Sequence, residues 1–121
     1  MKKAIFEHEI KILRDTFARL LRRNAHTNLV KLIRKTHPAD LAVVFRYFSD
    51  EEQAQVFSIM MEDGQAMEFL VELDDTLIAN LLENESPERI ATVIQESSAN
   101  DQSFILSTLE DEQAQSVIEL L

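Results

Sequence analysis

The chain has 121 residues, a formal net charge of −10 and 45% hydrophobic residues, but only one Gly, two Pro and no Cys. This length suffices for one domain with its own core, and the lack of Cys excludes disulfides, thiolate metal sites and cysteine nucleophiles. Few Gly and Pro favour helices over a sheet protein with many tight turns. The longest apolar run, Leu41–Phe45, is far shorter than the roughly 20 residues of a membrane span, and the first 24 residues lack the apolar stretch of a signal peptide.

The two signs of charge are separated along the chain. Residues 1–36 hold ten of the twelve Lys and Arg and three acids, a net of +7. Residues 37–121 hold nineteen acids with Arg46 and Arg89, a net of −17. We therefore expect a single domain with a basic N-terminal part, 1–36, and an acidic body, 37–121. An acidic body argues against direct nucleic-acid binding and favours cations or basic partner surfaces.

The basic part is predicted to form two helices. Apolar residues recur at steps of four, three, four and three, which predicts an amphipathic helix of about twenty residues. These residues are Phe6, Ile10, Leu13, Phe17 and Leu20. Leu29, Leu32 and Ile33 predict a shorter helix between Thr27 and Lys35. We expect the first helix to pack on the acidic body; pairing with a second chain, as a homodimer, and lying on a membrane surface by its basic face are the alternatives.

From His37 the sequence divides into seven phrases, six of twelve residues and one of thirteen. They are HPADLAVVFRYF, SDEEQAQVFSIM, MEDGQAMEFLVEL, DDTLIANLLENE, SPERIATVIQES, SANDQSFILSTL and EDEQAQSVIELL. Each opens with polar residues, which are expected to start a helix. A small residue recurs near the middle and a larger apolar residue three positions later. The small residues are Ala42, Ala54, Ala66, Ala79 and Ala91, and the larger ones are Phe45, Phe57, Phe69, Leu82, Ile94 and Leu106.

These phrases predict about seven helices of roughly eight to ten residues, which persist only by burying their apolar stripes on one another, as in a stacked helical solenoid. Ser49 and Glu52 have the spacing of a capping box. Pro38 and Pro87 suit a first helical position. The copies Glu51–Gln55 (EEQAQ) and Asp111–Gln115 (DEQAQ) are interpreted as one helix start written twice, five units apart.

Most other notable residues are expected to serve the fold. His8, His26 and His37 form no zinc-ligand pair, and His37 is expected to cap a helix or support a turn. Acids at predicted helix starts suit the helix dipole, with cation binding as the second interpretation. The methionines and phenylalanines are expected in the core, with a concave peptide-binding face as the alternative. No nucleophile elbow, Gly-rich phosphate loop or Ser/His/Asp spacing is present, so we do not expect an enzyme.

HPADLA at His37–Ala42, followed by acidic twelve-residue repeats that include EEQAQ, SPERIA and DEQAQ, resembles the N-terminal intracellular domain of MgtE-type magnesium transporters. The resemblance covers about Ala18–Leu121. It implies a right-handed superhelix of short helices, similar to the arrays of the flagellar switch protein FliG. It also implies a cytoplasmic position before a pair of CBS domains and a transmembrane channel domain. In this family Mg²⁺ at acidic interfaces holds the domain against the CBS pair.

The resemblance assigns candidate site residues one by one. Glu68, in Gly64–Phe69, matches an acid that faces the CBS domain in the family. Asp101 is the one match in Asn100–Phe104 to a D-D-x-x-D stretch of some members, because Asn100 and Phe104 depart from it. We therefore expect Glu68 and Asp101 as Mg²⁺ ligands. The interface candidates are Asp63, Asp74, Asp75 and Asp111.

The sequence leaves two main functions open, and a third, a membrane or nucleic-acid binder that uses basic helices, rests on residues 1–36 only. The first is a regulatory domain of an MgtE-type transporter or a related CBS-domain protein, which couples the Mg²⁺ level to docking on a neighbouring domain. The alternative is a protein-interaction scaffold, like the FliG arrays, with no role in ion sensing.

Overall fold

A computed structural model describes residues 7–121, and every regular element in that range is an α-helix. The predicted all-α class is therefore confirmed. The chain divides into two compact units, Met1–Gln65 (unit 1) and Ala66–Leu121 (unit 2). Among the described residues, none of the helices has both the length and the apolar content that crossing a bilayer requires.

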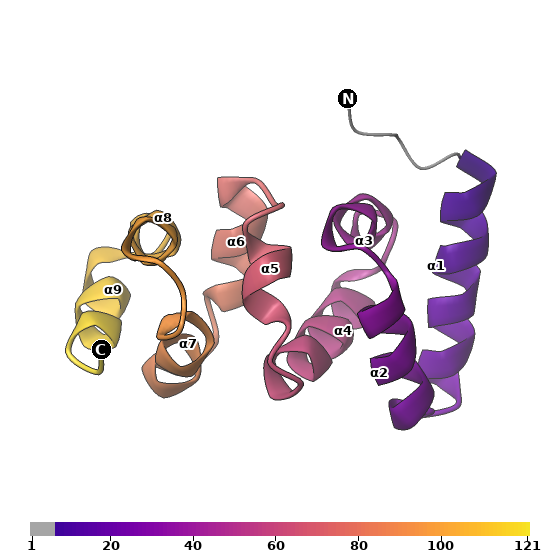
Figure 1. The fold of residues 1–121 in the computed structure, drawn as a ribbon, viewed down its shortest axis with the longest axis horizontal. Coiled ribbons are helices and arrows are strands. Elements are labelled where there is room, and N and C mark those ends of the chain that lie inside the picture. Colours follow the sequence, from indigo (N-terminus) through magenta and orange to yellow (C-terminus); the bar gives the residue numbers. More distant parts are fainter. Residues whose placement is uncertain (1–6) are drawn as a thin grey trace. The chain divides into compact units, whose positions relative to one another are not determined.

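Unit 1 contains four helices: α1 (Glu7–Arg22), α2 (His26–Lys35), α3 (Pro38–Phe45) and α4 (Asp50–Glu62). Helices α1 and α2 form a hairpin, α1 also packs on α3, and α2 packs on α4 (Figure 1). Phe17 of the predicted apolar stripe is fully buried, whereas Phe6 lies outside the described residues. The Phe17 and Phe48 rings meet edge-on with their centroids 5.4 Å apart, and Phe45 and Phe48 do so at 5.6 Å. An aromatic cluster thus joins α1 to the end of α3.

Two helices of unit 1 end in the same way. Asn24 after α1 and Gly64 after α4 adopt the left-handed backbone conformation, with φ of 52° and 75°. The amide of the residue after Gly64, Gln65, donates to the Met60 carbonyl at 2.9 Å, and that of Ala25 donates to Leu20 at 3.0 Å. This is the Schellman arrangement, which favours Gly or Asn at the left-handed position. The one glycine of the chain is therefore used to stop α4.

Unit 2 contains five helices: α5 (Ala66–Leu70), α6 (Asp75–Leu82), α7 (Pro87–Ile94), α8 (Ala99–Ser107) and α9 (Asp111–Ile118). Helix α7 is the centre of this unit, because it contacts α5, α8 and α9. Its Ile90 and Ile94 are fully buried. Fully or almost fully buried side chains of the other helices complete the core: Phe69, Leu70, Ile78, Leu82, Ile105 and Val117.

The twelve-residue phrases mark the helix starts in six of seven cases. Their first residues are the N-caps of α3, α4, α6, α7, α8 and α9: His37, Ser49, Asp74, Ser86, Ser98 and Glu110. All except Glu110 accept a hydrogen bond from a first-turn amide through the side chain. The expected capping box of Ser49 and Glu52 is present, and Pro38 and Pro87 are first helical residues. Local capping chemistry therefore sets the repeat.

The third phrase was predicted wrongly. Its first residues, Met61 and Glu62, do not start a helix but complete the last turn of α4, which has 13 residues. Helix α5 begins only at Ala66 and has five residues. The physical reason is that an apolar Met61 continues the stripe of α4, and the break comes where Gly64 permits a left-handed turn.

The alternation of small and large residues holds in part. Five of the six large residues are buried, but Leu106 is half-buried and its neighbour Ile105 takes the core position. Ala42, Ala66 and Ala91 are buried, whereas Ala54 is exposed and Ala79 is half-buried. Phe48 and Met60 are also in the core, as expected, while Met61 and Met67 are half-buried.

Candidate cation-binding and docking surfaces

The two predicted Mg²⁺ ligands lie at the starts of two different helices of unit 2. Glu68 is exposed in α5. Asp101 is half-buried in the first turn of α8, and its backbone amide donates to Ser98 Oγ at 3.1 Å. Within residues 7–121, no three His, Asp or Glu side chains converge as metal ligands would. A cation on Glu68 or Asp101 would need ligands from water or from another surface, which is compatible with the few carboxylates that Mg²⁺ takes in proteins.

Three of the four interface candidates are explained by helix starts. Asp74 Oδ1 accepts from the Leu77 amide at 2.9 Å and thereby caps α6. Asp75 and Asp111 are the first residues of α6 and α9, and both are exposed. A carboxylate there is stabilised by the helix dipole. These positions leave Asp75 and Asp111 accessible, while Asp74 is already engaged by backbone.

Asp63 has a different environment from the one expected. It lies at the C-cap of α4, not at a helix start. Arg34 of α2 donates to both of its carboxylate oxygens, from Nε at 2.9 Å and from Nη2 at 2.6 Å. The side-chain Nε2 of Gln65 also donates to Asp63 Oδ2. The hydrogen bond from Arg34, followed by that from Gln65, holds the pKa of Asp63 below its ordinary value, and burial opposes this shift.

The Arg34–Asp63 pair was not foreseen from the sequence. Its partners are 29 positions apart, on α2 and at the end of α4, and no local pattern relates them. The side chain of Asp63 is only 15% exposed. A bidentate guanidinium is a strong and geometrically specific partner for a carboxylate. Asp63 is therefore satisfied within unit 1.

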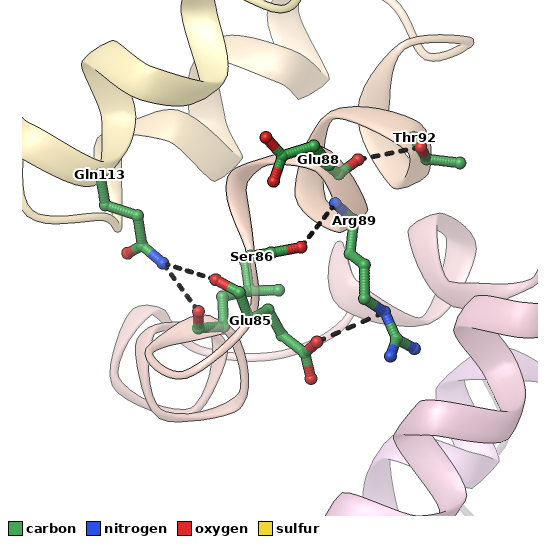
Figure 2. A network of polar contacts seen from close by, with 7 residues as sticks. Glu85, Ser86, Glu88, Arg89, Thr92 and Gln113 are labelled. Atoms are coloured by element: carbon green, nitrogen blue, oxygen red, sulfur yellow. Dashed lines mark hydrogen bonds and ion pairs between the residues drawn. The ribbon is translucent and has the colours of Figure 1, made fainter.

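In unit 2, a glutamine and an arginine tie α9 and α7 to the segment that follows α6 (Figure 2). Gln113 Nε2 donates to the Leu82 carbonyl at 2.9 Å, and its contact with the Glu85 carbonyl is longer, at 3.5 Å. Arg89 Nε lies 3.5 Å from Glu85 Oε1. The two contacts of Gln113 thus reach carbonyl groups at and just after the end of α6, where the Leu82 carbonyl also accepts from the Glu85 amide at 3.1 Å.

The two DEQAQ-like copies place their glutamines differently. Gln53 donates to Phe45, at the end of the preceding helix, at 3.0 Å. Gln113 instead reaches α6, three helices back in the sequence. The copies start 60 positions apart, but their N-caps, Ser49 and Glu110, are 61 apart (49 to 110) because one phrase has thirteen residues. Both copies are helix starts, as interpreted, but in registers that differ by one residue.

Charge is distributed unevenly between the two units. Unit 1 contains eleven Lys and Arg and nine Asp and Glu, a net of +2. Unit 2 contains thirteen acids and one cation, Arg89, a net of −12. Since Arg89 already pairs with Glu85, unit 2 has no unpaired cation to offset its other acids.

Grooves are present in each unit. In unit 2 a groove of about 420 Å³ is lined by Ala79, Thr108, Leu109 and Gln113 together with Glu83, Glu110 and Glu112. In unit 1, one groove lies beside the start of α1, with Lys11, Arg14 and Tyr47 in its walls. A second lies where α1 turns into α2 and includes Leu21, Leu29 and Ile59. The groove of unit 2 is thus acidic, and that at the start of α1 has cations in its wall.

The three histidines lie in different environments. His37 Nδ1 accepts from the Ala39 amide at 3.1 Å, so it caps α3 as expected. His8 and His26 are exposed. His8 is part of the groove at the start of α1, and His26 contributes slightly to the lowered pKa of Asp63.

The comparisons with known proteins agree with the repeat pattern. The family model described as the MgtE intracellular N domain matches residues 36–121, which is more than two thirds of the chain. No curated protein and no solved structure matches. The family is one of regulatory domains of a transporter and not a family of enzymes. The match begins just before the first twelve-residue phrase and continues through the last: the chain belongs to the family of MgtE intracellular N domains.

Proposed function

We propose that this chain is the cytoplasmic regulatory domain of an MgtE-type magnesium transporter or a related CBS-domain protein. In this proposal its acidic surface docks on a neighbouring domain in a way that depends on Mg²⁺. The CBS domains of the full-length protein are the proposed neighbour, together with a transmembrane channel domain where one is present. The observation that carries the proposal is the uncompensated charge of unit 2 within a chain of this family.

The physical basis is electrostatic. Thirteen carboxylates with one paired arginine repel any other acidic surface at contact distance. Exposed carboxylates such as Glu68, Asp75 and Asp111 need no rearrangement of the fold to meet a cation. Mg²⁺ would supply two positive charges between facing carboxylates while keeping several of its waters. Asp63 is the least suited of the candidates, because Arg34 already occupies both of its oxygens.

The test is limited proteolysis of the full-length protein across a Mg²⁺ titration, with Ca²⁺ and with NaCl of equal ionic strength as controls. We expect millimolar Mg²⁺ to protect the junction after Leu121, and NaCl alone not to do so. Glu68→Gln or Asp101→Asn should shift protection to higher Mg²⁺. Glu51→Gln, which removes an exposed first-turn acid of unit 1, should leave the titration unchanged.

The interaction scaffold is the outcome if Mg²⁺ has no specific effect. In that case the junction would be cleaved equally at all Mg²⁺ concentrations. A scaffold would use apolar contacts, and unit 2 offers Ile118, Leu120 and Leu121, each roughly half exposed. Substituting Ile118 and Leu120 by Ser would then abolish partner binding that does not respond to salt.

A further inference from the structure

We propose that an arginine cluster at the end of α1 docks on the acidic surface of unit 2 in a second copy of this chain. The cluster consists of Arg19, Arg22 and Arg23. It lies before residue 36, so it is outside the part of the chain that the family match explains. It is also independent of any role in Mg²⁺ sensing.

The three arginines lie within the last turn of α1 and have no acidic partner among residues 7–121. Arg22 is the last residue of α1, and Arg23 follows it with its amide still donating to the Arg19 carbonyl at 3.2 Å. Arg19 is therefore a neighbour of both Arg22 and Arg23, three and four positions on. All three are exposed, and none forms an ion pair with a described residue. This distinguishes them from the other arginines of the α1–α2 hairpin, Arg14 and Arg34, which pair with Asp15 and Asp63. The helix dipole accounts for cations at this end of α1, but it gives their guanidinium groups no acceptor among the described residues.

The acidic surface of unit 2, in contrast, has many carboxylates and few cations. Its one cation is paired, and two of its acids, Glu83 and Glu119, are the C-caps of α6 and α9. A carboxylate at a helix C-terminus is disfavoured by the dipole, so these two acids do not serve their own helices. Glu83 lines the groove of unit 2 together with Glu110 and Glu112. Guanidinium groups bind carboxylates through two parallel hydrogen bonds, so three arginines suit this rim.

A second copy fits the arginine cluster better than the other polyanions do. An anionic membrane or a nucleic acid would attract the cluster, but it would repel unit 2, whose net charge is −12, and would offer no cation to the acids of unit 2. A second copy instead brings the arginine cluster of one chain to the groove acids of the other, Glu83, Glu110 and Glu112. Because the two surfaces carry opposite charges and are exposed to solvent, the contact should weaken strongly as the ionic strength rises.

The first experiment is sedimentation velocity of the 121-residue chain over a range of concentrations, at about 20 mM and about 300 mM NaCl, where the screening length falls from roughly 20 to 6 Å. We expect the average mass to rise with concentration at low salt and to stay at that of one chain at high salt. Arg22→Gln/Arg23→Gln should weaken association at least tenfold. Lys11→Gln/Arg46→Gln, which removes the same charge from two other exposed sites, should not. A single-chain mass at every concentration and salt would overturn the proposal.

The second experiment is a charge exchange, which separates docking from misfolding. Arg22→Glu/Arg23→Glu and Glu83→Lys/Glu112→Lys should each remain single chains, with helical circular dichroism retained. Mixing the two variants should restore association, because each reversed surface then meets its opposite. Failure of the mixture to associate, or association of either variant alone, would contradict the proposal. Binding of the wild-type chain to anionic vesicles that is lost in Arg22→Gln/Arg23→Gln would assign the cluster to a membrane surface instead.

Discussion

The two units reach stability by different means. Unit 1 combines longer helices, an edge-on aromatic cluster of Phe17, Phe45 and Phe48, and a bidentate ion pair between α2 and the end of α4. Unit 2 is built from five short helices with α7 at the centre, and it has a mainly aliphatic core and thirteen acids. The net charge of unit 1 is small, +2, although Arg19, Arg22 and Arg23 pair with no described acid, whereas unit 2 has a net charge of −12. Unit 2 is therefore the part that a cation or a basic surface should affect most.

The largest effect should come from the aromatic cluster of unit 1. Phe17→Ala removes a fully buried ring and should cost about 3–5 kcal/mol of unfolding free energy. Urea unfolding followed by far-UV circular dichroism measures the loss. Ile12→Ala, at a position 60% exposed on the same helix, is the matched control and should change stability by less than about 0.5 kcal/mol.

Hydrogen exchange of the Phe17→Ala variant sharpens the comparison between the units. We expect amides of α1–α3 to lose protection while those of α7 keep it, because each unit has its own buried core. Equal loss of protection in both units would show one cooperative block and would contradict the division.

The next effect concerns a repeat start in unit 2. Ser98 caps α8 through the Asp101 amide at 3.1 Å, so Ser98→Ala should destabilise unit 2 by about 1 kcal/mol. Ser103→Ala, in the same helix and exposed, removes a hydroxyl without removing a cap and should be close to neutral. The urea midpoints of the two variants measure this difference. Equal midpoints would mean that the Ser98 cap does not stabilise α8.

A smaller loss of stability should distinguish Gln113 from Gln115, the two glutamines of the DEQAQ copy. Gln113→Ala removes the hydrogen bond to Leu82 and should cost about 0.5–1.5 kcal/mol. Gln115, two residues on, is exposed, and its replacement by Ala should cost less. The same order should hold for Gln53 and Gln55 in unit 1, where Gln53 bonds Phe45. If Gln113→Ala and Gln115→Ala are alike in urea unfolding, α9 is not held by this contact.

The smallest effect is the pH dependence of unit 1. The folded-state pKa of Asp63 is lowered, so its contribution is present above the unfolded-state pKa and is lost as the pH falls through the folded-state value. Below about pH 4, where unperturbed aspartates protonate, wild-type unit 1 should lose stability with a steeper slope than Asp63→Asn. Melting temperatures of the two proteins between neutral and acidic pH measure this difference, with Asp15→Asn as a control. A parallel loss in wild type and Asp63→Asn would show that the Arg34 contact has no energetic effect.

The features of the fold that the sequence predicted are those formed by residues close together in the chain. Caps such as Ser49 and Asp74 are formed by residues three apart, so periodicity and capping chemistry located six of seven phrase starts in advance. The α4–α5 junction failed because Gly64 was taken as part of a helix start, although glycine more often ends a helix in the left-handed conformation.

The candidate site was predicted less completely, because its contacts are long-range. Asp63 could be named as an acid but not as the partner of Arg34, since the pairing depends on how α2 packs on α4. The link from Gln113 to Leu82 is invisible for the same reason, because it spans 31 positions. The accessible positions of Glu68, Asp75 and Asp111 are, in contrast, the common outcome for acids in first turns.

The most direct test of the contrast between the units is a Mg²⁺ titration of the ¹⁵N-labelled chain by NMR, with NaCl of matched ionic strength as the reference. The exposed carboxylates of Glu68, Asp75 and Asp111 and the half-buried one of Asp101 should produce Mg²⁺-specific shifts at nearby amides of unit 2. The amides of Asp63 and its neighbours should respond to Mg²⁺ no more than to NaCl, because Arg34 occupies that carboxylate. Mg²⁺-specific shifts centred on Asp63, or shifts in unit 2 that NaCl reproduces fully, would contradict the account.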